Sequence, residues 1–306
     1  MERVEIENYL VLNKIGEGAF GKVYLGVEKE TKKKVALKRV TLKEEENGVP
    51  ISIIREITIL RKASHKNIIN ILEVFTGDLH RVKALEKTSF DIYIVFPYME
   101  SDLLQLIKTR KIEEKEAVLY TLQILEGVSY LHSKGVIHRD IKPANILIGK
   151  DRTVKLADFG LARAVSNGQM TEGIVTRWYR APEILLNTRK YSYSADIWSC
   201  GCVVAEIVQG APLFPSPTEE EQLESISDLC GEIDPSAICS QPEEQNKTSY
   251  GRKKRSKVRQ HFAPRSEMLA CLLERLLCVN PQIRITADEA VQQIRTYKPI
   301  DKKDSH

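Results

Sequence analysis

The sequence predicts an α+β fold in two parts, a small part built on an antiparallel β-sheet and a larger, mainly helical part. Up to about residue 96, apolar and polar residues alternate with a period of two, which is typical of strands. After Tyr98 the apolar residues recur with a period of 3.6, which is typical of helices. We place a hinge near residues 97–101 and expect the parts to comprise residues 1–98 and 99–306.

The first part is expected to form an antiparallel meander with one helix. The helix is predicted at residues 54–63, because Ile53, Ile57 and Leu60 recur at helical spacing on one face. The polar residues 77–89 are expected to form a surface loop. Strand patterns lie at residues 9–16, 22–29, 33–40, 69–75 and 91–96.

The second part is expected to begin with a long helix. Val118, Leu122, Leu125 and Tyr130 mark its apolar face, and Gly135 is a candidate for its C-terminal end, since glycine readily adopts the left-handed conformation there. Further helical patterns lie at residues 205–208, 220–230 and 268–277.

The composition is that of an ordinary globular protein. The 306 residues include 46 Lys+Arg and 42 Asp+Glu, which gives a formal net charge of +4, and 42% are hydrophobic. This composition argues against a disordered or collagen-like chain. No apolar run reaches the ~18–20 residues that span a bilayer, and the first residues lack the apolar stretch of a signal peptide. We therefore expect no membrane association and no direct nucleic acid partner.

Cysteine and histidine usage favours an intracellular, reduced protein without a zinc site. The six cysteines lie in the last third of the chain, and none forms a CxxC pair. Cys200 and Cys202 lie in an apolar stretch, so they are interpreted as buried thiols rather than metal ligands. The six histidines are scattered.

A glycine-rich segment follows the first strand pattern and suits a loop that covers phosphate groups, because glycines let backbone N–H groups approach phosphate oxygens. It consists of Gly16, Glu17, Gly18, Ala19, Phe20, Gly21, Lys22 and Val23. Alone, the segment is equally compatible with a plain hairpin turn or a dinucleotide-binding fingerprint. The fingerprint requires a helix directly after the glycines, whereas a strand pattern follows, which disfavours a Rossmann fold.

Lys38 lies on the next strand pattern, where alternation places Ala36 and Lys38 on one face. A lysine in such a position is usually a solvated residue. Here Glu56 follows on the predicted helix, and its carboxylate can fix the ammonium group for phosphate binding.

Three further motifs follow along the chain. The most specific is His138-Arg139-Asp140-Ile141-Lys142-Pro143-Ala144-Asn145, and Asp158-Phe159-Gly160 and Ala181-Pro182-Glu183 come after it. With the glycine-rich segment and Lys38, they have the order and spacing of the signature motifs of protein kinases. The sequence thus resembles a eukaryotic protein kinase over about residues 8–295, and the resemblance implies a two-lobed kinase fold with an N-lobe and a C-lobe.

The resemblance implies ATP and Mg²⁺ as cofactors. Lys38, held by Glu56, is expected to contact the α- and β-phosphates. Asp158 and Asn145 are expected to coordinate Mg²⁺, which prefers hard oxygen ligands.

The resemblance also implies roles for two residues next to the transferred group. Asp140 is expected to accept or orient the proton of the substrate hydroxyl, and Lys142 to neutralise charge on the γ-phosphate. Because every residue that an active kinase needs is present, an inactive pseudokinase is disfavoured.

Residues 96–102 are expected to hold the adenine. Family members commonly have an acidic residue where this chain has Pro97, which lacks an N–H. The adenine amino group is expected to donate to the carbonyl of Pro97, which proline retains, and the N–H of Met99 to donate to the ring. Asp102 is expected to bind the ribose hydroxyls. The ring is expected to be sandwiched by Ile15, Val23, Ala36 and Leu147.

Pro50-Ile51-Ser52-Ile53-Ile54-Arg55-Glu56 resembles the cyclin-facing helix of the cyclin-dependent kinases. Its isoleucines exceed the needs of one amphipathic face, so a cyclin-like partner is expected to cover part of them. A core helix with additional isoleucines is the alternative.

Thr171 falls at the activating phosphorylation position of this family, counted back from Ala181-Pro182-Glu183. An upstream kinase is therefore an expected partner. The added phosphate needs clustered arginines, which the family supplies at Arg55, Arg139 and Arg163. Gly173 stands where mitogen-activated kinases have tyrosine, which disfavours that family.

The features most similar to the transcription-elongation branch, which phosphorylates the RNA polymerase II C-terminal repeat, are the PISIIRE helix, the loop at 77–89 and the stretch IVFPYMESDLLQLI. Ala19-Phe20 replaces the inhibitory Thr-Tyr pair of cell-cycle members. Residues 175–180 resemble the proline-directed branch, so Ser/Thr-Pro substrates are expected. The resemblance to the transcription-elongation branch implies a location in the nucleus, with the cytoplasm as a further location. The basic run at residues 252–259 is a candidate nuclear import signal, a patch for acidic substrates or a solvated face.

Alternatives to this function remain open at the level of sequence. The chain could be a cell-cycle or kinase-activating member, a kinase that needs no cyclin, or a catalytically silent scaffold that binds a cyclin without turnover.

Overall fold

The computed structural model describes residues 4–18, 21–43, 49–77, 89–160, 162–164, 177–186, 191–238 and 254–297. The chain forms two compact units. The first comprises Met1–Ser101 and Leu147–Leu161, and the second comprises Asp102–Ile146 and Ala162–His306. The first passage from one unit to the other lies close to the predicted hinge.

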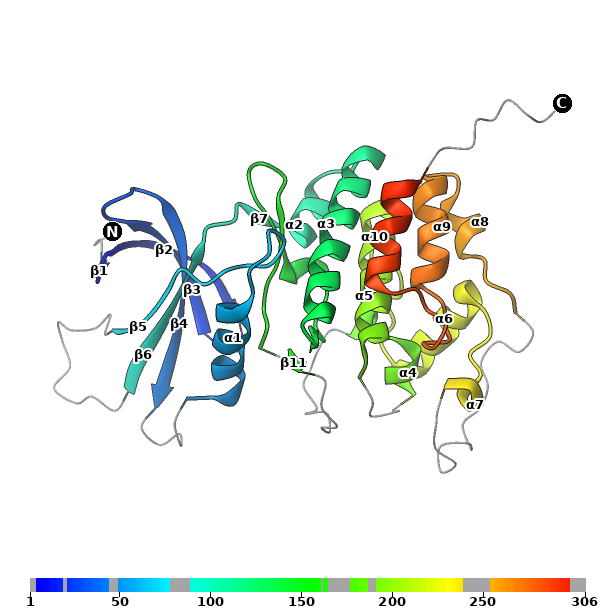
Figure 1. Ribbon diagram of the computed structural model, residues 1–306, viewed down its shortest axis with the longest axis horizontal. Helices are drawn as coiled ribbons and strands as arrows, with labels where there is room; N and C mark the ends of the chain where they lie inside the picture. The colour runs from blue at the N-terminus through cyan, green and yellow to red at the C-terminus, as the bar shows by residue number, and fades with distance from the viewer. Residues whose placement is uncertain are drawn as a thin grey trace. The chain divides into compact units, whose positions relative to one another are not determined.

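The first unit contains a six-stranded sheet in which every pair of neighbours is antiparallel (Figure 1). The long pairing of β4 with β6 sets Val35 opposite Pro97 and Leu42 opposite Phe90. In sheet order, the strands are β1 (Val4–Ile6), β2 (Tyr9–Gly18), β3 (Gly21–Glu28), β4 (Lys34–Lys43), β6 (Ser89–Pro97) and β5 (Glu73–Gly77).

The helix α1 (Ile51–Lys62) packs on one face of this sheet. Ile53 is 1% exposed and joins a cluster with residues of β4 and β6, including Leu42 and Ile94. Tyr9, Leu37 and their neighbours form a separate cluster from alternate positions of the same strands. The expected helix at residues 54–63 thus starts earlier, at Ile51, and the buried Ile53 anchors its first turn.

The expected strand at residues 69–75 is shorter than its pattern suggested. Ile69 N–H donates to Leu156 O at 2.9 Å, and Leu156 N–H donates to Asn67 O at 2.9 Å, so the start of the expected strand binds β10 (Val154–Leu156). Bonding to β6 begins at Leu72, whose N–H donates to Val95 O at 2.8 Å. Asn67 also donates through Nδ2 to Val154 O at 2.9 Å. These bonds attach residues 147–161 to the first unit. β10 also pairs with β9 (Ile146–Ile148), which pairs with β7 (Ser101–Asp102).

The second unit is mainly helical, as expected (Figure 1). The long helix α3 packs against α5 and α10, and α9 packs against α5, α8 and α10. Trp198, Phe214 and Phe262 are fully buried in this unit. The helices are α2 (Leu103–Thr109), α3 (Glu114–Ser133), α4 (Pro182–Leu185), α5 (Tyr193–Gln209), α6 (Glu219–Cys230), α7 (Pro235–Ile238), α8 (Val258–Phe262), α9 (Glu267–Leu276) and α10 (Ala287–Thr296).

Local signals set the ends of these helices. Gly135, with φ of 73°, follows α3, and its N–H donates to His132 O at 3.0 Å, which places the expected glycine just beyond the helix. At the other ends, the side chains of Asp102, Thr218, Ser266 and Thr286 each accept an N–H from three residues further along.

Cys200 and Cys202 lie buried in α5, and burial raises the pKa of both thiols well above the ordinary value. Among the described residues, no three or more His, Cys, Asp and Glu side chains are grouped to hold a metal ion. Of the helices in the described ranges, none has the length and apolar character that crossing a membrane requires.

Candidate active site

The motif residues lie in two groups, one in each unit. In the first unit, Lys38 Nζ donates to both carboxylate oxygens of Glu56, at 2.9 and 2.7 Å. Lys38 lies opposite Ile94 in the sheet, on the face that α1 covers. The Lys38 side chain is 15% exposed and that of Glu56 3%, so the pair is largely shielded from water.

Burial raises the pKa of Glu56, and Lys38 lowers it in part. The charge of Asp158 also raises it. A lysine in this setting presents a fixed positive charge to an anionic ligand.

The glycine-rich segment is a hairpin between β2 and β3, in which Gly16 pairs with Val23 and Gly18 with Gly21. Gly21 has φ of 140°, and a Cβ there would lie 2.1 Å from Arg39 O, so only glycine fits. Ala19 and Phe20 lie outside the described residues.

The residues expected around adenine lie on several strands. Ile15 is 43% exposed on β2, and Ala36 lies opposite Leu25 and Phe96 in the sheet. Pro97 ends β6, opposite Val35, and Leu147 lies in β9. Asp102 caps the start of α2, because its Oδ1 accepts the N–H of Gln105 at 2.8 Å.

In the second unit, Asp140, Lys142 and Asn145 come together. Lys142 Nζ donates to Asp140 Oδ2 at 2.8 Å and to Oδ1 at 3.1 Å. Asn145 Nδ2 donates to Asp140 Oδ2 at 2.7 Å and to Asp140 O at 2.8 Å. This arrangement holds the carboxylate in one orientation beside a cation.

The Asn145 contacts also bear on metal binding. Both N–H groups of its amide are directed at Asp140, so the amide oxygen is not used in these two bonds. A carboxylate and an amide oxygen are ligand types that suit Mg²⁺. Asp158, the other residue expected to bind the metal, belongs to the first unit and has a φ of 62°.

Asp196 is a functional residue that the sequence reasoning did not identify. It is fully buried at the start of α5, and its carboxylate accepts the N–H of His138 at 2.8 Å and that of Arg139 at 2.9 Å. It thereby fixes the backbone directly before Asp140. The available signal was an aspartate inside the otherwise apolar run of α5.

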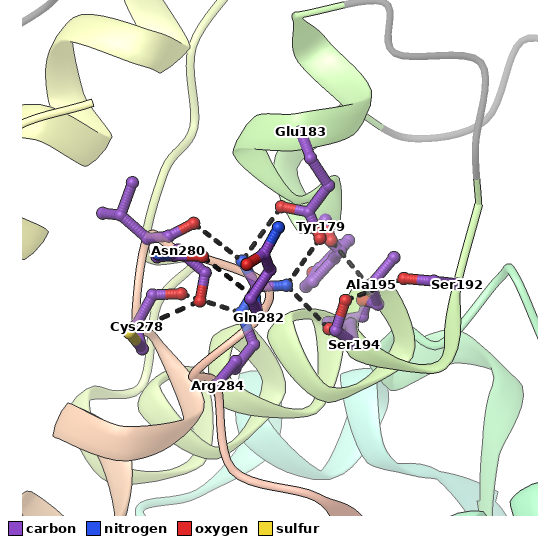
Figure 2. A network of polar contacts seen from close by, with 11 residues as sticks. Tyr179, Glu183, Ser192, Ser194, Ala195, Cys278, Asn280, Gln282 and Arg284 are labelled. Carbon is purple, nitrogen blue, oxygen red and sulfur yellow. Dashed lines mark hydrogen bonds and ion pairs between the residues drawn. The ribbon is translucent and has the colours of Figure 1, made fainter. Parts of the chain in front are cut away.

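A second unanticipated contact anchors Glu183 of the third motif. Arg284 binds both carboxylate oxygens of Glu183, at 2.6 and 2.9 Å (Figure 2). Arg284 also donates to backbone oxygens of Cys278, Val279 and Ser194. The pair is almost fully buried, with exposures of 0% and 4%.

The expected regulatory residues are only partly described. Arg55 lies on α1, and Arg139 precedes Asp140. Arg163 pairs through its backbone with Ile137, in strands β11 (Arg163–Ala164) and β8 (Val136–Ile137). Thr171 lies outside the described residues.

Comparisons with known proteins identify relatives over nearly the whole chain. The family model of the protein kinase domain matches residues 9–294. Human Cyclin-dependent kinase 9 is 38% identical over 304 residues, which are 94% of this chain and 80% of the human protein. Cyclin-dependent kinase C-1 of Oryza sativa subsp. japonica is 39% identical over 294 residues, which are 92% of this chain and 56% of the rice protein.

A nematode relative extends the same group. Cyclin-dependent kinase 12 of Caenorhabditis elegans is 37% identical over 303 residues, which are 94% of this chain and 40% of the nematode protein. The chain thus spans about half the length of several curated relatives it matches. These matches confirm the fold class and the resemblance drawn from the motifs. The chain belongs to the protein kinase family and, within it, to the cyclin-dependent kinases.

Proposed function

We propose that this chain is the catalytic subunit of a cyclin-dependent serine/threonine kinase that transfers the γ-phosphate of ATP to Ser/Thr-Pro sites. The observation that carries the proposal is the arrangement around Asp140, whose carboxylate accepts hydrogen bonds from Lys142 and Asn145. A carboxylate held in this way can take the proton of a substrate hydroxyl, while the adjacent ammonium offsets the negative charge of a phosphoryl group. In this proposal, residues 1–98 are the N-lobe and residues 99–306 the C-lobe.

The nucleotide and metal roles follow the family residue by residue. Lys38, fixed by Glu56, binds the α- and β-phosphates, and Asp158 and Asn145 hold Mg²⁺, which neutralises phosphate charge when bound. The glycine-rich hairpin covers the phosphates. Adenine and ribose are held by Ile15, Val23, Ala36, Pro97, Met99, Asp102 and Leu147.

A cyclin-like subunit is the proposed partner at α1. Ile51 is 72% exposed and Ile54 51% exposed on this helix, although both are large apolar side chains. Covering them with an apolar partner surface would remove the cost of their contact with water. If binding of the partner shifted α1, the shift would also move Glu56, which lies on this helix and holds Lys38.

Phosphorylation of Thr171 by an upstream kinase is the proposed second control. The phosphate would bind Arg55, Arg139 and Arg163, which come from three separate segments. Arg139 directly precedes Asp140, so a phosphate bound there acts on the backbone of the proposed base.

The proposed physiological role is transcription control in the nucleus, with the RNA polymerase II C-terminal repeat as substrate. The matches to Cyclin-dependent kinases 9, 12 and C-1 support this branch over the cell-cycle branch. In the basic run, Lys254 pairs with Asp228, and Arg259 pairs with Glu267 at 2.6 Å. These two ion pairs favour a solvated face for the described part of the run.

The test is transfer of radiolabelled phosphate from ATP to a peptide with Ser-Pro sites, using the chain purified with its cyclin-like subunit. Asp140→Asn and Lys38→Met are expected to abolish transfer while both proteins stay folded. Lys111→Met, on an exposed turn, is the matched control and is expected to keep full activity. Transfer by Asp140→Asn at the wild-type rate would refute the assignment.

Two control reactions separate the alternatives. A peptide with alanine after the acceptor serine is expected to react poorly, and equal reaction would exclude proline-directed specificity. Full activity of the isolated chain would favour a kinase that needs no cyclin. No transfer by the intact, Thr171-phosphorylated complex would favour a silent scaffold.

A further inference from the structure

Tyr191 lies just before α5 and contacts Arg139 in two ways. Its hydroxyl donates to the backbone oxygen of Arg139 at 3.3 Å, and its ring lies 5.4 Å from the guanidinium carbon of Arg139. The N–H of Arg139 is held from the other side by Asp196 Oδ1 at 2.9 Å. Tyr191 and Asp196 therefore hold the same residue of the catalytic loop at its carbonyl and its amide.

Arg139 needs this support because its φ is 71°, in the left-handed region that side chains disfavour. Such a conformation persists only where surrounding contacts fix it. The next residue is Asp140, so a change in the Arg139 backbone would turn the carboxylate that Lys142 and Asn145 orient.

Tyr191 is suited to act as a permanent donor. Burial, followed by the negative charge of Asp196, raises the pKa of its hydroxyl well above the ordinary value. The carboxylates of Asp140 and Glu183 act in the same direction. The hydroxyl therefore stays protonated at physiological pH.

The ring contact holds the Arg139 guanidinium over the Tyr191 ring, with the guanidinium carbon 5.4 Å from the ring centroid. A cation–π contact of this kind uses the charge of the guanidinium and not its hydrogen-bond donors, which match phosphate oxygens. The contact also reduces the rotamer freedom that the arginine would otherwise lose when it binds.

We propose that Tyr191 is a positioning residue for phosphate transfer. Its hydroxyl fixes the peptide group before Asp140, and its ring holds the Arg139 guanidinium ready for the phosphate on Thr171. This inference rests on the proposed kinase function, and it assigns the two effects to separate parts of one side chain.

The two parts can be separated by substitution. Tyr191→Phe keeps the ring and removes the hydroxyl, so kcat is expected to fall about three- to tenfold with and without Thr171 phosphorylation, while KM changes less than twofold. Tyr191→Leu also removes the ring, so the ratio of phosphorylated to unphosphorylated activity is expected to fall several-fold as well. Tyr297→Leu, at the end of α10 in the same unit, is the matched control and is expected to leave kcat and that ratio within twofold of the wild type.

The outcomes distinguish this inference from the proposed function. Wild-type kcat and activation ratio in Tyr191→Leu would overturn the inference while the kinase assignment stands, and equal losses in Tyr297→Leu would overturn it in favour of general destabilisation. If the wild-type complex transfers no phosphate, the proposed function fails. Hydrogen exchange then tests Tyr191 alone: Tyr191→Leu is expected to speed exchange of the backbone amides of residues 138–142 relative to Tyr297→Leu, and unchanged exchange would overturn the inference.

Discussion

Replacing Arg284 by leucine is expected to lower the free energy of unfolding of the second unit by about 3–5 kcal/mol, the range for breaking a buried ion pair. All five N–H groups of Arg284 are used. Nε donates to Cys278 O at 2.8 Å, Nη1 to Glu183 Oε1 and Ser194 O, and Nη2 to Glu183 Oε2 and Val279 O (Figure 2). Leucine would leave the Glu183 carboxylate and three backbone oxygens without these donors.

This loss should be easy to measure. For a domain of 150–250 residues, each 1 kcal/mol shifts the unfolding midpoint by roughly 2–4 °C, so the expected fall is about 6–20 °C. Urea unfolding is the preferred assay, because large proteins often unfold irreversibly on heating. Both tryptophans of the chain, Trp178 and Trp198, belong to the second unit, so their fluorescence follows its unfolding.

Two further variants control for other causes. Arg259→Leu removes an ion pair with Glu267 whose side chains are 52% and 45% exposed, so little loss of stability is expected. The double variant Glu183→Leu/Arg284→Leu removes the buried carboxylate as well and should be less destabilised than the sum of its single changes. A loss in Arg284→Leu no larger than in Arg259→Leu would refute the reasoning.

Three more predictions concern other parts of the chain. Because burial raises the pKa of Glu56 above 4.5, its contribution to stability is present below pH 4.5 and lost as the pH rises through the folded pKa. Lys38→Met removes the positive charge that limits this rise in the pKa of Glu56. The loss in free energy of unfolding caused by Lys38→Met, measured with urea, should therefore be larger at pH 7 than at pH 4.5, and equal losses would contradict the Lys38–Glu56 ion pair. Ile54→Glu, at a position 51% exposed, should weaken binding of the cyclin-like subunit at least tenfold without changing the unfolding midpoint, and unchanged affinity would place the partner elsewhere. Thr286→Ala should cost about 1 kcal/mol, because it removes the capping box with Glu289 at the start of α10, and a value near zero would speak against that cap.

The sequence predicted features that depend on neighbouring residues. Period-two alternation located the strands that carry Lys38, and helical spacing located α1, α6 and α9. The motif residues Asp140, Lys142 and Asn145 lie within six positions of one another, so one short segment was enough to bring them together. The glycine beyond α3 was also visible as a local signal.

Contacts between distant residues were not predictable in this way. Arg284 and Glu183 are separated by 101 positions, and Asn67 and Val154 by 87. Local periodicity predicts neither that residues 147–161 belong to the first unit nor that β5 is shorter than the strand expected at residues 69–75. Asp196 was not predicted because its partners, the backbone N–H groups of His138 and Arg139, lie more than 50 positions away in the sequence.

Two of the unpredicted contacts, those of Arg284 and Asp196, meet at the start of α5. Ser194 O accepts a hydrogen bond from Arg284 at 2.7 Å, and two residues later Asp196 holds the N–H groups before Asp140. Glu183 is therefore connected to Asp140 through Arg284 and the first turn of α5. Because each link orients the next, Arg284→Leu should lower kcat even in the fraction of protein that remains folded.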